Sequence, residues 1–315
     1  PQLRFKGYGG GRERLLFVVI AFFKSFKYKT VILGHINLAV LGYWIKRINP
    51  SVRLIVVAHG IEVWKAHHSL KLKVLEVADS ILAVSNFTKE QILSYNPTIT
   101  PSKIRIFPNA IDPYTIIPTS FEKPEYLLKR YSLDRSTPVL LTVTRLAFSE
   151  KYKGYDKVIE SMPALLGKHK NLKYLLCGMA DQNEGIRIES LIERIHAAGS
   201  VKLLGFIKDS ELLDHYLLAD VFVMQSKKEG FGIVFIEALA CGRKVIAGSK
   251  DGSSETLLNG QLGTLIDPDD SDQLVNAIEK ALDNQNYNSL ELQQRVIESF
   301  GFHRYKDRLS NYLAS

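Results

Sequence analysis

Short apolar runs rich in β-branched residues alternate with segments of helical periodicity along the first third of the chain. The runs interpreted as strands are residues 29–34, 52–59, 80–85 and 103–108. The helical segments between them are residues 38–48, 69–78 and 86–95, the last with Ser85 or Asn86 as its N-cap. Strands that alternate with helices predict right-handed βαβ units and a parallel sheet.

The pattern fades between residues 108 and 138, where five prolines interrupt it and leave room for one short helix at 126–131. Beyond this connection the predicted strands are 139–144, 174–178, 201–206, 221–225 and 244–247. The predicted helices are 156–169, 186–198, 211–219 and 233–241, followed by an amphipathic helical tail at 272–284 and 290–313. This second series predicts a second doubly wound sheet.

Two Rossmann-like α/β domains follow from these patterns, residues 1–115 and residues 116–299, and a C-terminal helix at 300–315 is expected to pack back on the first domain. Ligands of such sheets bind beyond the carboxyl ends of the strands. We therefore expect the functional site in the cleft where the two sets of strand ends face each other.

Composition narrows the class of protein. Hydrophobic residues make up 46% of the chain and charged residues 23%, values that exclude collagen-like and disordered chains. The net charge of +8 favours anionic partners such as nucleotides, phosphate groups or acidic membranes. The Lys and Arg residues of the chain are dispersed and form no basic-aromatic stripe, so no nucleic-acid partner is predicted. Two distant cysteines form no C-x-x-C pair, which favours a reducing, cytoplasmic setting without a zinc site.

The longest apolar run, residues 15–23, is shorter than the about 20 residues that a membrane-spanning helix needs. Basic residues flank it, so it could lie on an anionic bilayer surface at the inner face of the membrane. Burial inside the protein is the preferred interpretation. Peripheral contact with an anionic membrane is the alternative.

The densest cluster of candidate chemistry is the sequence EGFGIVFIEALACG, from Glu229 to Gly242. Two glycines precede a helix, so the backbone can approach a ligand closely and the helix N-terminus can hold a diphosphate. Glu229 precedes this helix and Glu237 lies within it, a spacing that lets two carboxylates address two parts of one elongated ligand. The structural alternative is that Glu229 interacts with the helix dipole and Glu237 is a solvated surface residue.

Glu229 and Glu237 form the E-x7-E signature, and this segment resembles the retaining GT-B glycosyltransferases of family 4, the glycosyl transferases group 1. The resemblance extends over nearly the whole chain. It includes Thr144-Arg145-Leu146, Lys153-Gly154, Gly178, Leu204-Gly205-Phe206-Ile207 and Gly252-Ser253-Ser254-Glu255. It implies a GT-B fold of two Rossmann-like domains facing a cleft.

The resemblance also implies a role for each matching residue. Arg145 and Lys153 would neutralise the diphosphate of a UDP- or GDP-sugar, Glu229 would hold the transferred sugar, and Glu237 the ribose. The remaining donor-binding positions implied are Gly178, Phe206, Ile207, Gly230, Phe231, Gly232, Ile233 and Val234. Taken alone, Arg145 and Lys153 would be read as solvated surface residues, but their place at a strand end favours function.

Candidate acceptor-side residues lie in the first domain. His59 follows a buried strand, and the resemblance places a histidine there against the transferred sugar. His35 and Asn37 end the preceding strand and are expected to shape the acceptor pocket, with an ordinary loop as the alternative. Trp64 is a further acceptor-side candidate, with packing in a surface loop as its alternative.

Two further segments refine the expectation. Asp267-Pro268-Asp269-Asp270 is similar to a metal-binding D-x-D, but it precedes a predicted helix, so turn and N-cap chemistry explains it better and no metal is expected. Nothing strand-like precedes Gly9-Gly10-Gly11. We therefore expect the first βα unit of the fold to be absent or replaced.

The sequence thus predicts a metal-independent, retaining hexosyltransferase without a cofactor, in polysaccharide or glycoconjugate biosynthesis. It would move a sugar from a nucleotide diphosphate to a hydroxyl of a glycan or lipid-linked acceptor. The resemblance implies front-face attack, in which the donor phosphate accepts the acceptor proton. The alternatives are a nucleotide-sugar-binding module without turnover and a GT-B nucleotide-sugar epimerase.

Overall fold

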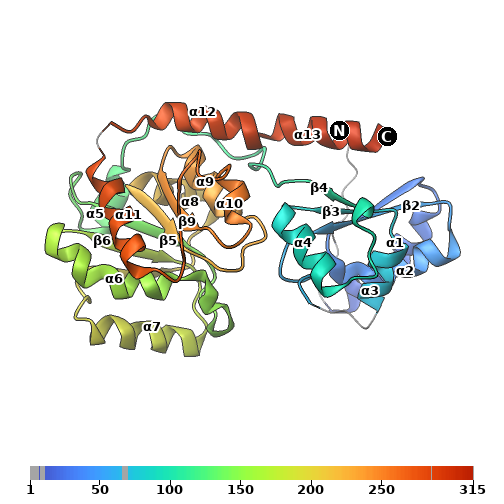
Figure 1. Ribbon diagram of the computed structural model, residues 1–315, viewed down its shortest axis with the longest axis horizontal. Helices are drawn as coiled ribbons and strands as arrows, with labels where there is room; N and C mark the ends of the chain where they lie inside the picture. Colours follow the sequence, from blue (N-terminus) through green and yellow to red (C-terminus); the bar gives the residue numbers. More distant parts are fainter. Residues whose placement is uncertain (1–6, 8–10, 66–69, 285, 315) are drawn as a thin grey trace. The chain divides into compact units, whose positions relative to one another are not determined.

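The chain divides into two compact units, residues 1–107 and residues 108–315. The computed structural model describes residues 7, 11–65, 70–284 and 286–314 (Figure 1). Both units are α/β, each built on one parallel sheet. The packing of the C-terminal helix on the first domain stays a prediction.

The first unit contains a four-stranded parallel sheet in the order β1-β2-β3-β4. Its strands are β1 (Thr30–Leu33), β2 (Arg53–Ala58), β3 (Ser80–Ala83) and β4 (Ile104–Ile106). Its helices are α1 (Gly11–Ser25), η1 (Ile36–Leu38), α2 (Ala39–Ile48), α3 (Leu70–Val77), α4 (Asn86–Tyr95) and η2 (Pro101–Lys103). The Ser85 hydroxyl accepts a hydrogen bond from Thr88 N at 3.0 Å and caps α4, as the sequence predicted.

Helix α1 corrects one expectation. The apolar run at 15–23 is helical, but its preferred burial is wrong, because Leu15 is 71% exposed and Phe23 is 67% exposed. The other face of α1, with Phe17 and Phe22, packs against a small cluster formed by Leu41 and Ile45 of α2 and by Val52. Among the described residues, no helix is long and apolar enough to cross a bilayer.

The second unit contains a six-stranded parallel sheet in the order β10-β9-β8-β5-β6-β7. Its strands are β5 (Val139–Val143), β6 (Lys173–Cys177), β7 (Val201–Gly205), β8 (Val221–Met224), β9 (Lys244–Gly248) and β10 (Thr264–Ile266). The order reverses direction at β5, as in doubly wound sheets that bind ligands at that point.

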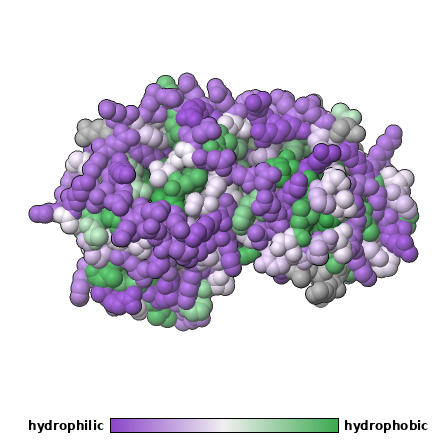
Figure 2. Space-filling model, viewed as in Figure 1, coloured by the Kyte–Doolittle hydropathy of each residue, from purple (hydrophilic) through white to green (hydrophobic). Residues whose placement is uncertain are grey.

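Helices cover both faces of this sheet. Helices α6 (Tyr155–Lys168), α7 (Gln182–Arg194) and α11 (Ser271–Asp283) pack together, while α8 (Asp209–Leu218), α9 (Ile233–Ala240) and α12 (Ser289–Phe300) form a second group (Figure 1). The remaining helices are α5 (Glu125–Tyr131), η3 (Phe148–Lys153), α10 (Ser253–Thr256) and α13 (Phe302–Ala314). The visible surface is largely hydrophilic, and apolar residues gather in small separate areas (Figure 2).

Two helical segments depart most from the sequence prediction. Helix α7 begins at Gln182 rather than 186, because the Asp181 carboxylate accepts from Glu184 N at 2.9 Å and caps it there. The tail helix predicted at 290–313 is two helices, separated at Gly301, which has an extended backbone (φ −65°, ψ 153°). A side chain on Gly301 would lie 2.4 Å from the Ile297 carbonyl oxygen, so glycine permits this break.

The segment 267–270 is a turn and a helix cap, as predicted. The Asp270 carboxylate accepts from Gln273 N at 2.9 Å at the start of α11. Asp267 accepts from Asp269 N at 2.9 Å, and Lys250 pairs with both of these carboxylates. These contacts explain why three acids occur together.

Candidate functional site

The carboxyl ends of β5, β6 and β7 come together around Gly178. Thr144 N donates to Cys177 O at 2.9 Å, and Gly178 N donates to Gly205 O at 2.9 Å. Gly178 has φ +144°, and a Cβ there would lie 1.7 Å from the Thr144 carbonyl oxygen. Only glycine fits this position, so the ends of the three strands can approach one another closely.

Lys153 and Glu229 meet at this edge. Lys153 Nζ donates to Glu229 Oε1, and the two side chains are only 14% and 12% exposed. The two loops that carry them are joined by a hydrogen bond of 2.9 Å from Lys227 N to Tyr152 O. The sequence placed both residues in one site from segments 76 positions apart, and the structure brings them together.

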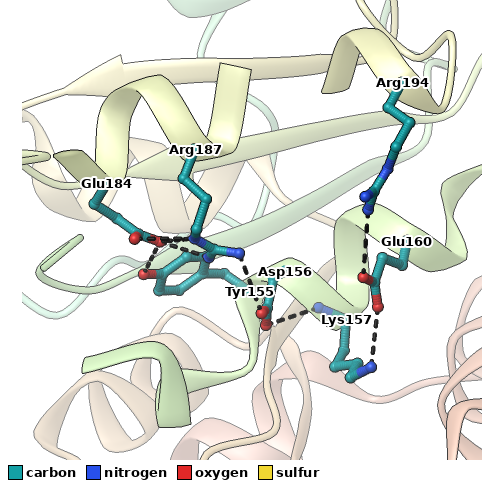
Figure 3. A network of polar contacts seen from close by, with 7 residues as sticks. All are labelled: Tyr155, Asp156, Lys157, Glu160, Glu184, Arg187 and Arg194. Atoms are coloured by element: carbon teal, nitrogen blue, oxygen red, sulfur yellow. Dashed lines mark hydrogen bonds and ion pairs between the residues drawn. The ribbon is translucent and has the colours of Figure 1, made fainter. Parts of the chain in front are cut away.

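A buried polar network anchors the helix that follows Lys153 (Figure 3). At the start of α6, the Tyr155 hydroxyl donates to the Glu184 carboxylate of α7 at 2.6 Å. Arg187 donates to the same carboxylate and lies 3.5 Å from Asp156 of α6. Because Tyr155 and Glu184 have no exposed surface, this network fixes the start of α6, and with it the backbone next to Lys153.

Arg145 follows β5 but is 79% exposed and pairs with Glu150 at 2.6 Å. Glu150 lies in η3, between Arg145 and Lys153 along the chain. The structure therefore puts Arg145 at the same strand edge, directed to a carboxylate that the sequence reasoning did not single out. Its contact with a diphosphate stays a prediction.

Helix α9 begins directly after the Glu229 loop, with Gly232 as its N-cap in the left-handed region at φ 83°. Phe231 is buried and packs edge-to-face on Phe300 with ring centroids 5.4 Å apart. This contact fixes the loop below the helix start, while Ile233 and Val234 form the first turn. The amide groups of a first helical turn suit an anion.

Glu237 is half-buried in α9, and one of its oxygens accepts from the Tyr216 hydroxyl at 2.8 Å. Burial raises the pKa of Glu237, and the charge of Asp112 raises it further, while the Tyr216 hydrogen bond lowers it. Glu237 lines an open hollow of about 480 Å³ with Ile233, Asp112 and the aromatic residues Tyr114, Phe302 and Tyr305. A solvated surface glutamate, the structural alternative, does not describe this position.

The predicted residues after β7 extend the same strand edge. Phe206 is 69% exposed and Ile207 is partly exposed. An exposed aromatic ring next to a ligand-binding strand end offers a surface for a planar base. Their contact with the donor stays a prediction.

The predicted residues of the first unit form their own cluster at the ends of β1 and β2. His59 Nε2 donates to Gly34 O at 2.7 Å, and the rings of His35 and His59 stack with centroids 6.1 Å apart. His35 Nδ1 accepts from Asn37 N at 3.0 Å, while the Asn37 side chain accepts from Lys71. Glu62 accepts from His59 N at 2.6 Å and so fixes the loop after β2.

Trp64 lies beside this cluster but packs inward. Its ring meets Phe87 edge-to-face at 5.1 Å and lies against the apolar core of the first unit. These contacts describe the packed loop that the sequence analysis gave as the alternative. A role for Trp64 on the acceptor side stays a prediction.

Asp251 is a site residue that the sequence reasoning missed. It is 4% exposed, and its carboxylate accepts from Glu229 N at 2.7 Å. Its only sequence signal is an Asp-Gly pair after a strand, which is the ordinary signature of a turn. Nothing in that pattern indicates contact with a loop 22 positions earlier.

Two α/β units, each built on one parallel sheet, define the class of GT-B glycosyltransferases, and the second carries the Lys153–Glu229 pair at its strand ends beside the start of α9. The chain belongs to the glycosyl transferases group 1, whose family model matches residues 127–299. A second model, Glycosyltransferase Family 4, matches residues 4–114.

Curated relatives agree with this family. The chain is 29% identical over 255 residues to a GDP-mannose-dependent α-(1-6)-phosphatidylinositol monomannoside mannosyltransferase of Mycolicibacterium smegmatis, with 76% of this chain and 63% of that protein covered. It is 24% identical over 259 residues to an alpha-maltose-1-phosphate synthase of the same species, with 77% and 65% covered. The chain spans less than two thirds of the length of these relatives.

Solved structures confirm the fold. Anabaena HepE, solved in complex with UDP and glucose, superposes with a TM-score of 0.78 at 20% identity, covering 97% of this chain and 83% of that one. A sucrose-phosphate synthase of Thermosynechococcus elongatus gives a TM-score of 0.73 at 22% identity, with 96% and 79% covered. The predicted family and GT-B fold are therefore confirmed.

Proposed function

We propose that this chain transfers a sugar, with retention of anomeric configuration, from a nucleoside diphosphate sugar to a hydroxyl of a glycan or lipid-linked acceptor. The observation that carries the proposal is the Lys153–Glu229 pair at the start of α9. It combines a cation, a carboxylate and a helix N-terminus at the edge where doubly wound sheets bind ligands.

The diphosphate is assigned to Lys153 and the first turn of α9. The Lys153 ammonium has three N–H donors, and the contact with Glu229 uses one of them. The other two are available to phosphate oxygens. When the sugar leaves, negative charge builds on the diphosphate, so fixed donors around it stabilise the transition state more than the ground state. Arg145 supplies a second cation if it exchanges Glu150 for the phosphate.

The two acids are assigned to the two ends of the donor. Glu229 accepts hydrogen bonds from hydroxyls of the transferred sugar. Glu237 has one oxygen bonded to Tyr216, so its other oxygen is left to accept from the ribose hydroxyls. His59 positions the sugar or the acceptor from the first unit. The leaving diphosphate oxygen takes the proton of the attacking acceptor hydroxyl.

Thermal stabilisation by nucleotide sugars tests the donor assignment. We expect GDP-mannose or UDP-glucose, at about 100 times its dissociation constant, to add about 2.7 kcal/mol of stability. That corresponds to a rise of about 5 °C or more in Tm for a domain of this size. Because side-chain cations and helix amides balance the diphosphate charge, the shift is expected in EDTA as well.

The products of the same incubations separate transfer from its alternatives. Product sugar bound to an added glycan or lipid acceptor, with the anomeric configuration of the donor, supports the proposal. Donor binding without product would instead identify a binding module, and an epimerised nucleotide sugar an epimerase. No stabilisation by any GDP-, UDP- or ADP-sugar would contradict all three.

A lipid-linked acceptor requires the chain to reach a membrane surface, and α1 is the segment proposed to do so. Leu15 and Phe23 are exposed, and basic residues including Lys24 and Lys27 accompany them. Apolar side chains with flanking cations favour an anionic interface. The phosphatidylinositol in the name of the Mycolicibacterium relative is an anionic lipid of this kind.

Vesicle sedimentation measures this contact. The double substitution Leu15→Ser/Phe23→Ser is expected to lower binding to phosphatidylglycerol vesicles by at least about tenfold, since it removes two large apolar side chains from the interface. Ile186→Ser, at a position 58% exposed on α7, is the matched control and should bind like the wild type. Equal binding of the double variant, or no binding of the wild type, would rule out α1 as the membrane contact.

A further inference from the structure

Asp251 is a second buried carboxylate directly behind the Glu229 loop. Its Oδ2 accepts from Glu229 N at 2.7 Å, and its Oδ1 accepts from Ser253 N at 2.9 Å. Buried acids are rare unless their oxygens are bonded. Both oxygens of Asp251 have a backbone donor, so the carboxylate joins the loop after β8 to the loop after β9.

The next residue completes the connection. Gly252 N donates to Glu229 O at 2.9 Å, so two adjacent residues hold both backbone polar groups of Glu229. A side chain on Gly252 would lie 2.3 Å from the Gly230 carbonyl oxygen, so this close approach requires glycine. Further along, the Thr256 hydroxyl donates to Phe231 O. The whole stretch before α9 is therefore fixed from one side by residues 251–256.

We propose that Asp251 is a positioning residue for sugar transfer, because it holds the Glu229 backbone so that the Glu229 carboxylate faces the donor sugar beside Lys153. This inference rests on the proposed function. It adds a residue to the site that acts through Glu229 and not by touching the donor. Small displacements of such a loop have large effects on rate, since reacting groups must be held within a few tenths of an ångström.

The ionised form of Asp251 is the one that fits these contacts. A carboxylate can accept from both amides, whereas a protonated carboxyl turns one oxygen into a donor. Burial raises the pKa of Asp251 to about 6, while the hydrogen bonds from Ser253 and Glu229 lower it. Among charged groups, Glu229 raises this pKa, and Lys153 pairs with Glu229. Lys250 and Glu255 are near neighbours of Asp251 along the chain.

The sign of the pH dependence follows. Above about pH 6 Asp251 is ionised and holds the Glu229 amide, and below it the proton weakens this hold. Turnover is therefore expected to rise between pH 5 and 7. The folded-state pKa lies above the usual value near 3.9, so any stability contribution of this group is greatest at low pH and is lost as the pH rises to 6. Stability and turnover change in opposite directions, which separates positioning from a purely structural role.

The test compares the wild type with Asp251→Asn and a matched control, Asp270→Asn. Asp270 also accepts from a backbone amide, but at the cap of α11, where asparagine serves equally well. Release of the nucleoside diphosphate from GDP-mannose or UDP-glucose is measured from pH 5 to 8, together with binding of GDP and UDP. We expect kcat of Asp251→Asn at pH 7.5 to fall at least about tenfold, with a flat profile between pH 5 and 7. Binding of the nucleotide diphosphate should change by less than about threefold.

Each outcome decides the matter. A folded Asp251→Asn variant with wild-type kcat, or with the wild-type rise between pH 5 and 7, overturns the inference. If its Tm shows that it does not fold, Asp251→Glu replaces it, since this variant keeps the charge. It should then show a lower kcat with the pH rise preserved, and a flat profile would overturn the inference. If the wild type binds neither GDP nor UDP, the proposed function itself is contradicted. That result differs from one in which the wild type binds and turns over and the Asp251 variant has the same kcat and pH profile, which contradicts only the role of Asp251.

Discussion

Substituting alanine for Lys153 is expected to lower the rate of sugar transfer about 100- to 1000-fold, the usual effect of removing one fixed donor from a developing negative charge. The Lys153 side chain is 14% exposed, so its interaction with a diphosphate is little weakened by water. The same change leaves Glu229 buried without its cationic partner, which adds to the loss. Steady-state kinetics with a saturating acceptor measure the effect.

Lys157→Ala, four residues further along the chain and inside α6, is the matched control. Lys157 pairs with Glu160 at 3.0 Å, and this pair is 46% and 39% exposed. Exposed pairs of this kind contribute little, so the control should retain transfer within about twofold and unfold at nearly the wild-type temperature. Near-normal turnover of a folded Lys153→Ala variant would show that the diphosphate binds elsewhere.

Changing Glu229 to glutamine is expected to lower kcat/KM for the nucleotide sugar about 100-fold. The amide keeps the size of the side chain but removes a charge and replaces one acceptor oxygen with a donor. Hydrogen bonds to a charged acceptor are the stronger ones, so sugar hydroxyls lose most of their hold. Binding of the bare nucleotide diphosphate should persist, because it depends on Lys153 and the start of α9.

Glu193→Gln, an exposed position on α7, is the control for this change. It should match the wild type in both kinetics and nucleotide binding. If Glu229→Gln lost the nucleotide and the nucleotide sugar to the same degree, Glu229 would act on the diphosphate side and its assignment to the sugar would be wrong.

Most of the second unit could be predicted from the sequence because its signals are local. Strand and helix periods identify β5 to β9, and the glycines around α9 indicate the end of the sheet where we propose that a diphosphate binds. The error at α7 has a local cause as well. Asp181 caps that helix, which therefore begins at Gln182, four residues before the predicted start at 186.

The burial of α1 could not be predicted, because periodicity shows which positions are apolar and not which of them find a partner. Phe22 contacts the α2 cluster, whereas Phe23 on the neighbouring position is exposed. Both are equally apolar in the sequence. Exposure is a tertiary property, and a short apolar run with basic flanks leaves it open.

The residues of the candidate site also divide into those predicted from local sequence signals and those that depend on tertiary contacts. Lys153 and Glu229 were predicted to lie together, and their side chains are in contact, because strand ends of a parallel sheet meet at one edge. Their role in one functional site stays a prediction. Arg145 lies at that edge too, but its direction depends on Glu150, which no motif marked. Asp251 could not be predicted because its sequence context is that of a turn, and only the structure shows that its carboxylate accepts a hydrogen bond from the Glu229 amide.

The most direct test of the account is calorimetric titration of GDP and UDP into the wild type, Lys153→Ala and Lys157→Ala. The account predicts that the wild type and Lys157→Ala bind one of the two nucleotides, and that the dissociation constant rises at least about tenfold in Lys153→Ala. The corresponding nucleoside, which lacks the diphosphate, should bind far more weakly to all three. Equal affinity of Lys153→Ala and wild type for the nucleotide, or equal affinity of the wild type for nucleotide and nucleoside, would contradict a diphosphate held by Lys153 at the start of α9.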